Sequence, residues 1–256
     1  MGPGSRAGAA GRVTAIPAIT AHQMREVDRL MVEAYGIQLI QMMEHAGRNL
    51  AELVRDLLGG SVTERAIFVA AGKGNNGGGG LNAARHLSNW GAHITVGVDN
   101  SNALRGVPAL QWQTLMKLAV ARFEGTAALR NLEHKRADLV VDALIGYGLD
   151  GPPRGWVAEM IEQINARASS IVALDVPSGL DATAGTAHAP CIAAKATMTL
   201  ALPKTGLLVP EAQKYVGALY LADIGVPDAL YRQMRLAVGP IFARGTLIRL
   251  SGGGEG

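Results

Sequence analysis

The sequence predicts an α/β fold in which helices cover both faces of a doubly wound, mostly parallel sheet. Six short apolar segments alternate with segments that have helical character. The apolar segments are continuous rather than alternating with polar residues, as is typical of strands buried on both faces. Alternation of such strands with helices favours a parallel sheet.

The N-terminal part predicts two helices before the first strand. Thr20 is a suitable N-cap for a helix over 21–34, which has apolar residues at helical spacing. A second helix is predicted over 37–58, because Gly59 and Gly60 follow it as C-terminal capping residues. The predicted strands span 66–71, 93–98, 139–145, 171–176, 196–202 and 218–224. The helices predicted between them span 80–90, 109–119, 154–167 and 210–216.

Length and composition suit one large domain, or at most two small ones, with an aliphatic core. The chain has 256 residues, of which 48% are hydrophobic and 4% aromatic. We expect a flexible N-terminal segment over 1–19, a folded domain over 20–228, and a C-terminal extension with a flexible tail over 229–256. The tail Ser251–Gly256 should be mobile because it is rich in glycine.

Charge and cysteine content exclude several classes of protein. A net charge of +3, without a cluster of basic and aromatic residues, argues against nucleic-acid binding. The single Cys191 excludes an internal disulfide and a multi-cysteine metal site, and a buried thiol is expected there. No apolar run is long enough to cross a membrane, and no secretory signal is evident. We therefore expect a cytoplasmic protein.

A glycine-rich run at residues 71–80 is the strongest sign of a ligand site. It lies between a predicted strand and a predicted helix, where backbone N–H groups and the helix N-terminus can face an anion. Its centre is Asn75, Asn76, Gly77, Gly78 and Gly79. Glycine lets a ligand approach the backbone closely, and the two amides offer both donors and acceptors. The alternative is a simple chain reversal, which does not require two asparagines.

Two further polar loops follow predicted strands, at 142–153 and 175–184. Asp142 and Asp175 end apolar strands, where a carboxylate needs a partner if it is buried. Ligands of doubly wound sheets bind at the carboxyl ends of the strands, so we expect these loops and Ser178 to converge on one site. Lys204 follows the next strand and could neutralise a phosphate or act as an acid–base group. The alternatives are turn-forming aspartates and a solvated lysine.

Other catalytic patterns are missing. His45 and His86 lie on predicted helices, and no spacing of His, Asp or Glu resembles a zinc or iron site. There is no Gly-x-Ser-x-Gly motif of serine hydrolases and no Gly-Lys-Ser/Thr phosphate loop. The glycine run also differs from the fingerprint of dinucleotide-dependent dehydrogenases.

Seven motifs, in order along residues 24–227, resemble the NAD(P)H-hydrate epimerase family. They are MREVD (24–28), MEHAGR (43–48), GKGNNGGGGL (72–81), VDALIG (141–146), DVPSG (175–179), KTG (204–206) and DIGVP (223–227). The resemblance implies a Rossmann-like three-layer α/β/α sandwich that is commonly a homodimer. It also implies an isomerase of cofactor repair, which interconverts the R and S forms of hydrated NADH and NADPH for a separate dehydratase.

The resemblance also implies particular site residues. A potassium ion is expected near Asn76, Asp142 and Ser178. Substrate contacts are expected from residues 75–79, from Asp175, and from the loop Gly146, Tyr147, Gly148, Leu149, Asp150, Gly151 and Pro152. C6 of the hydrated ring bears a hydroxyl group and is bonded to the ring nitrogen. Its inversion requires loss and return of the hydroxyl group, or ring opening, with proton transfer. We expect Asp175 to be the acid–base group and Lys204 to support it electrostatically.

Two positions depart from the family pattern. Gly79 stands where the family usually has Asp, and His45 stands where it usually has Asn. Loss of a carboxylate from the ligand loop is expected to weaken ribose or substrate contacts. The alternatives are therefore a catalytically inactive relative that binds a nucleotide or a partner, and a related enzyme with another small-molecule substrate.

Overall fold

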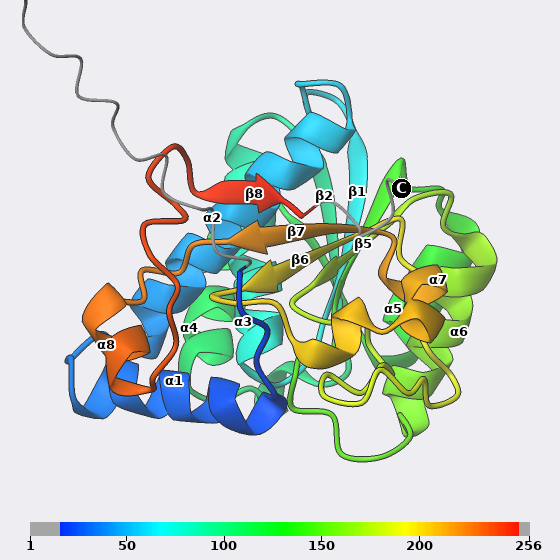
Figure 1. Cartoon of the computed structure of the whole chain (residues 1–256). Helices are drawn as coiled ribbons and strands as arrows, with labels where there is room; N and C mark the ends of the chain where they lie inside the picture. Colours follow the sequence, from blue (N-terminus) through cyan, green and yellow to red (C-terminus); the bar gives the residue numbers. More distant parts are fainter. Residues whose placement is uncertain (1–15, 251–256) are drawn as a thin grey trace, which may run out of the picture.

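The computed structural model describes residues 16–250 and contains one eight-stranded sheet (Figure 1). The strand order is β3-β2-β1-β4-β5-β6-β7-β8. The first seven strands pair in parallel, and β8 is antiparallel to β7. The strands are β1 (Ala66–Ala71), β2 (His93–Val98), β3 (Ala121–Glu124), β4 (Leu139–Ala143), β5 (Ile171–Leu174), β6 (Ala196–Leu200), β7 (Ala218–Ala222) and β8 (Leu247–Arg249).

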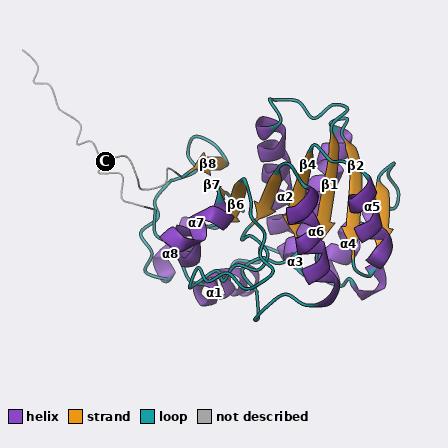
Figure 2. Cartoon of the chain, turned by 90° about the vertical axis from the view of Figure 1, so that its right-hand side faces the viewer, coloured by secondary structure: helices purple, strands orange, loops and turns teal. Residues whose placement is uncertain are grey.

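Helices cover both faces of this sheet, so the predicted three-layer α/β/α architecture is confirmed. The α-helices are α1 (Ala21–Glu33), α2 (Leu39–Leu57), α3 (Asn75–Asn89), α4 (Gly106–Leu115), α5 (Gly125–His134), α6 (Gly155–Arg167), α7 (Gln213–Val216) and α8 (Asp228–Gln233). One apolar cluster joins α1–α4 to the sheet through residues such as Leu50 and Leu81. A second cluster joins α5 and α6 to the other face through Leu132 and Met160 (Figure 2).

The sheet reverses its direction of growth between β1 and β4. From β1 the chain proceeds outward through β2 to β3, then returns to β4 on the other side and continues to β7. Loops that follow β1 and β4 therefore diverge, which opens a crevice at their carboxyl ends.

The predicted glycine loop is largely helical. α3 begins at Asn75, five residues before the start predicted at residue 80. Close packing explains this difference, because a Cβ on Gly80 would lie 2.4 Å from the Cβ of Ala143 on β4. A Cβ on Gly77 would lie 1.9 Å from the carbonyl oxygen of Gly72. Glycines in this helix thus allow it to pack closely against the sheet.

The sequence predicted β1 and β2 correctly, but other boundaries differ. The strands predicted to end at 145, 176, 202 and 224 each end two residues earlier. Asp175 and Ala201, which follow β5 and β6, have φ values of 68° and 65°, which a strand does not accommodate. The helix predicted over 109–119 is shifted to Gly106–Leu115, and the one predicted over 210–216 is a 3₁₀ turn, Pro210–Ala212, followed by α7.

Two α-helices and two strands were not predicted: α5, α8, β3 and β8. The sequence of β3, Ala-Arg-Phe-Glu, is short and half polar because it lies at the edge of the sheet. β8 has three residues and depends on pairing with β7. Such elements lack the apolar run that identifies buried strands.

The segment before α1 packs against the rest of the domain, unlike the flexible segment predicted over 1–19. Ile19 is completely buried, and its backbone N–H group donates to the carbonyl oxygen of Pro203 (2.8 Å). Thr20 caps α1 as predicted and forms a capping box with Gln23. The predictions for residues 1–15 and for the tail 251–256 lie outside the described residues. Between residues 16 and 250, no helix has the length and apolar character needed to cross a bilayer.

Candidate active site

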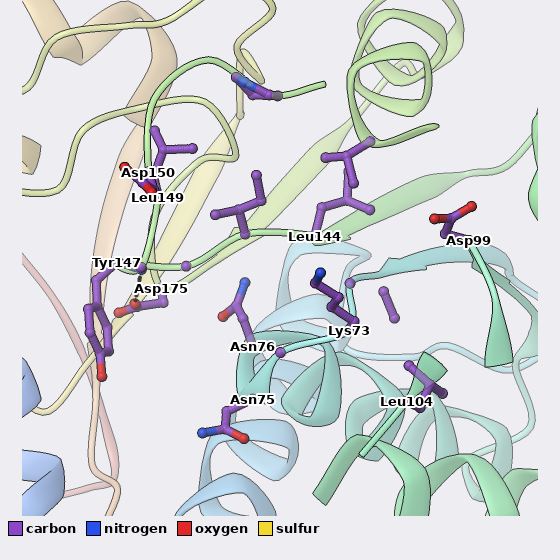
Figure 3. Close-up of a pocket in the computed structure, with 18 of the residues that line it drawn as sticks. Lys73, Asn75, Asn76, Asp99, Leu104, Leu144, Tyr147, Leu149, Asp150 and Asp175 are labelled. Atoms are coloured by element: carbon purple, nitrogen blue, oxygen red, sulfur yellow. Dashed lines mark hydrogen bonds between the residues drawn. The ribbon is translucent and has the colours of Figure 1, made fainter. Parts of the chain in front are cut away.

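A cavity of about 910 Å³ lies over the carboxyl ends of β1, β2, β4 and β5. All three predicted loop regions contribute to it, as the sequence suggested. Figure 3 shows Asp175 and Tyr147 at one end and Asp99 and Leu104 at the other. The lining residues include 71–76, 98–100, 103–104, 144–154, 156–157 and, from α1, Met24, Arg25 and Asp28.

The N-terminus of α3 faces the middle of this cavity. Gly74, Asn75 and Asn76 line it, and the first helical hydrogen bond runs from Gly78 N to Gly74 O. The preceding N–H groups of the first turn have no acceptor within the helix. The N-cap Gly74 provides no side-chain cap, and the exposed Lys73 adds positive charge nearby. This end of α3 therefore suits an anionic group such as a phosphate.

Asp175 and Lys204 form a buried ion pair at one end of the cavity. Lys204 is completely buried, so the alternative of a solvated lysine is wrong. Its Nζ donates to Asp175 Oδ1 (2.6 Å) and to the carbonyl oxygen of Leu200 (2.8 Å). Asp175 lines the cavity and is 2% exposed. Lys204 is held beneath it and acts on the cavity through the carboxylate.

A left-handed backbone conformation directs the Asp175 side chain. Its φ of 68° turns the chain immediately after β5. The second carboxylate oxygen, Oδ2, accepts a hydrogen bond from Tyr147 N (3.0 Å) in the loop after β4. Gly146 is needed for this approach, since a Cβ there would lie 3.1 Å from Asp175 Oδ2 and from Asn76 Cγ. The three loops are thus tied together around Asp175.

Tyr147 and Asp28 form a second polar pair at the same end. The Tyr147 hydroxyl donates a short hydrogen bond to Asp28 Oδ2 on α1. Burial raises the pKa of Asp28, although the Tyr147 hydroxyl group and the charge of Lys204 oppose this shift. Burial and the negative charge of Asp28 also raise the pKa of Tyr147. Arg25 and Lys204 lie over the Tyr147 ring, each 5.9 Å from its centroid.

Asp142 and Ser178 lie beneath the lining of the cavity. Asp142 is completely buried, and its carboxylate accepts hydrogen bonds from Ser178 Oγ (2.6 Å), Ser178 N (2.8 Å) and Leu144 N (3.2 Å). These donors are neutral, and burial raises the pKa of Asp142 to about 6 despite them. A cation beside the carboxylate would offset this burial cost.

The side chains of Asn76, Asp142 and Ser178 offer oxygen atoms of the types that bind a monovalent cation. Asn76 donates through Nδ2 to the carbonyl oxygen of Leu174 (3.2 Å), which leaves its Oδ1 as an acceptor. Carboxylate, amide and hydroxyl oxygens are ligands of hard cations. Among the residues that the structure describes, no group of three His, Cys, Asp or Glu side chains could hold a transition metal.

Gly77, Gly78 and Gly79 are buried and are not among the residues that line the cavity, so their predicted contacts with substrate stay a prediction. A Cβ on Gly79 would point at Leu174 Cδ2 (2.9 Å), with Met43 Sδ at 3.7 Å. Position 79 therefore faces the packed interior between α2, α3 and β5, so the family difference there does not remove a group that lines the cavity. His45 is exposed and lies beside Gly225.

The sequence analysis did not assign several residues that line the cavity. Asp28 and Arg25 belong to the MREVD motif, which was recognised without a role for its members. Asp99 follows β2 directly and begins a polar segment, residues 99–102, whose place after a strand was a usable signal that the sequence analysis did not take up. Trp156 on α6 gave no signal, since an aromatic residue in a helix is usually part of the core.

The family model described as YjeF-related protein N-terminus matches residues 39–206. An NAD(P)H-hydrate epimerase of Dehalogenimonas lykanthroporepellens is 44% identical over 93% of this chain and 94% of its own length. An NAD(P)H-hydrate epimerase of Rhodopirellula baltica is 34% identical over 86% of this chain and 89% of its own length. A bifunctional NAD(P)H-hydrate repair enzyme Nnr of Moorella thermoacetica is 39% identical over 83% of this chain but only 41% of its own length.

The fold also matches a solved structure. The crystal structure of yeast YNL200c has a TM-score of 0.78 and 23% sequence identity, and the match covers 92% of this chain and all of that one. The same arrangement of sheet and helices thus occurs in a protein of low sequence identity.

Proposed function

This chain belongs to the family of YjeF-related protein N-termini, and we propose that it is an NAD(P)H-hydrate epimerase that interconverts the R and S forms of hydrated NADH and NADPH. The observation that carries this proposal is the buried pair of Asp175 and Lys204 at one end of a cavity that also receives the N-terminus of α3. The cavity thus combines an anion site with a carboxylate held in a fixed position.

The cavity suits a dinucleotide in size and in chemistry. Its volume of about 910 Å³ is near the upper end of ordinary ligand sites, about 300–1,000 Å³. The pyrophosphate would bind at the N-terminus of α3, where Asn75 and Asn76 are located. The hydrated nicotinamide ring would then lie near Asp175 and Tyr147.

Inversion at C6 requires one proton to move at the C6 oxygen atom. In one route the C6–O bond breaks, the ring nitrogen forms a C=N bond, and the oxygen leaves as water after it takes a proton. In the other route the C6–N bond breaks, the hydroxyl group loses its proton to become an aldehyde, and the nitrogen takes a proton. Return from the opposite face completes either route. Asp175 is the acid–base group at the C6 oxygen, and Lys204 sets its charge and position.

A potassium ion beside Asn76, Asp142 and Ser178 is part of this proposal. It would supply positive charge to the buried Asp142 carboxylate and thereby stabilise the loops that follow β1, β4 and β5. The uncompensated burial of that carboxylate supports the ion. Asn76, Asp142 and Ser178 provide oxygen ligands of suitable type.

We further propose a cytoplasmic homodimer that works with a dehydratase. The exposed apolar residues Leu110 and Met116, 50% and 60% exposed near α4, support self-association. The names of the bifunctional relatives support coupling to further repair chemistry. The low cysteine content suits a reducing compartment.

The test is restoration of the S epimer. An NADHX mixture depleted of its S form is incubated with the protein and potassium, and the epimers are separated by chromatography. We expect conversion of R to S well above the uncatalysed rate. Folded protein that gives no acceleration would instead support a binding relative or another substrate.

A further inference from the structure

The Asp99 carboxylate lies where it could accept hydrogen bonds from the adenosine ribose of a bound dinucleotide. Asp99 follows the last residue of β2, Val98, and β2 pairs directly with β1. In Rossmann-type domains that bind a dinucleotide, an acid after the phosphate-binding turn hydrogen-bonds to a ribose hydroxyl group. Asp99 lines the same cavity as the N-terminus of α3.

The backbone around Asp99 is held from two sides. Its carbonyl oxygen accepts a hydrogen bond from Gly125 N (2.9 Å). Glu124 accepts hydrogen bonds from Ser101 N and Ser101 Oγ, both at 2.8 Å. These contacts fix the turn between β2 and the following 3₁₀ helix, Ser101–Ala103, while the Asp99 side chain remains exposed. The carboxylate is therefore presented from a rigid position.

Apolar side chains near Asp99 suit an adenine ring. Val98, Leu104 and Trp156 all line the cavity. Trp156 Nε1 donates to Gly125 O (2.9 Å), and Gly125 in turn donates to Asp99 O. Trp156 and Asp99 thus border the same end of the cavity. Figure 3 shows Asp99 and Leu104 at the end opposite to Asp175, with Asn75, Asn76 and Lys73 between them.

The order of these groups sets the orientation of a bound dinucleotide. The reacting carboxylate, the anion site at α3 and the apolar end with Asp99 follow one another along the cavity. We propose that the adenosine half binds at the Asp99 end, that Asp99 accepts hydrogen bonds from its ribose hydroxyl groups, and that the enzyme therefore prefers NADHX to NADPHX. This inference rests on the proposed function. A 2′-phosphate at this place would put two negative groups side by side, which disfavours NADPHX.

Kinetics with both substrates tests the inference. We expect kcat/KM of the wild type to be about tenfold to a hundredfold higher for NADHX, the change expected for one hydrogen bond to a charged group. Asp99→Ser should raise KM for NADHX with little change in kcat, and should reduce or abolish the preference. Asp56→Ser is the matched control, because Asp56 is an exposed acid on α2 that does not line the cavity.

A binding measurement separates this inference from the reaction itself. By calorimetry, the wild type should bind ADP-ribose more tightly than 2′-phospho-ADP-ribose, and Asp99→Ser should lose this difference. Equal turnover of NADHX and NADPHX by the wild type would overturn the role of Asp99 and leave the proposed function intact. Turnover of neither substrate would overturn the proposed function and the inference that depends on it.

Discussion

Lys204 Nζ lies 2.6 Å from Asp175 Oδ1, and both side chains are buried at the end of the cavity. A lysine in such a position compensates a carboxylate that could not otherwise remain charged there. Loss of either partner should therefore lower the free energy of unfolding as well as disturb the proposed chemistry.

Replacement of Asp175 by Asn should remove activity and leave the protein folded, with a lower free energy of unfolding because Lys204 loses its anion. Asn tolerates the positive φ at this position better than most residues do, and it keeps an acceptor for Tyr147 N. Without an acid–base group, kcat should fall by about 10²–10⁴-fold. Epimerisation rates and circular dichroism measure the two effects. Asp56→Asn is the control, and wild-type turnover by Asp175→Asn would contradict the assignment.

Replacement of Lys204 by Met should damage stability more than Asp175→Asn does. It leaves the buried Asp175 carboxylate without its cation, which should cost about 3–5 kcal/mol of the free energy of unfolding. Urea denaturation measures this change. The double variant Lys204→Met/Asp175→Asn should recover part of the loss, because it removes the unpaired charge. If the double variant were as unstable as the sum of the two single ones, the pair would not be coupled.

Burial of Asp142 predicts a pH dependence of stability in buffer without potassium. Its pKa is about 6 in the folded state and about 3.8 when unfolded. Between these values the folded state binds more protons, so the free energy of unfolding falls as pH rises from about 4 to about 6. The total loss is about 3 kcal/mol, since one pKa unit corresponds to about 1.4 kcal/mol.

Potassium should reverse this loss if it binds beside Asp142. Thermal unfolding at pH 7.5 should show a higher Tm in potassium chloride than in choline chloride at equal ionic strength. Asp142→Asn should have a flatter pH profile and lose the potassium effect. A potassium effect of equal size in both proteins would place the ion elsewhere.

Replacement of Tyr147 by Phe should destabilise the contact between α1 and the loop after β4. It leaves the mostly buried Asp28 without its hydroxyl donor, at an expected cost of about 1–3 kcal/mol. Guanidinium denaturation measures the change. Tyr220→Phe is the control: it removes a hydroxyl group on β7 that does not contact Asp28, and it should lower the free energy of unfolding less.

Gly80→Ala should disturb the packing of α3 against the sheet. The added methyl group would lie 2.4 Å from Ala143 Cβ, and overpacking of this kind costs about 1–3 kcal/mol. Gly148→Ala is the matched control, because its added Cβ meets nothing within 4 Å. Equal Tm values for the two variants would contradict the packing argument.

Much of the fold was predictable because its central strands carry strong local signals. β1 is a continuous apolar run and β2 is mostly apolar, and the bounds of both were predicted correctly. The start of α3 was predicted five residues too late, because glycine has low helix propensity. The helix forms there because its glycines allow close contact with β4. Tertiary packing determined this boundary, and the local sequence contained no sign of it.

The site was predictable where a residue follows a strand in sequence. Asp175 and Asn76 both line the cavity, as expected from their places after β5 and β1. The contact between Asp28 and Tyr147 joins residues 119 positions apart, so no local pattern predicts it. A side chain at position 79 would point into the core because of the way α3 packs on the sheet. The spacing of residues in the sequence does not predict this direction.

The two edge strands limit how the chain can associate with other chains. β8 is only three residues long and covers β7, while β3 at the opposite edge is four residues long and carries Arg122 and Glu124. Short strands with charged residues are poor templates for the addition of a further strand. The protein is thereby protected against growth of the sheet into aggregates, and its self-association would have to use helical surfaces instead.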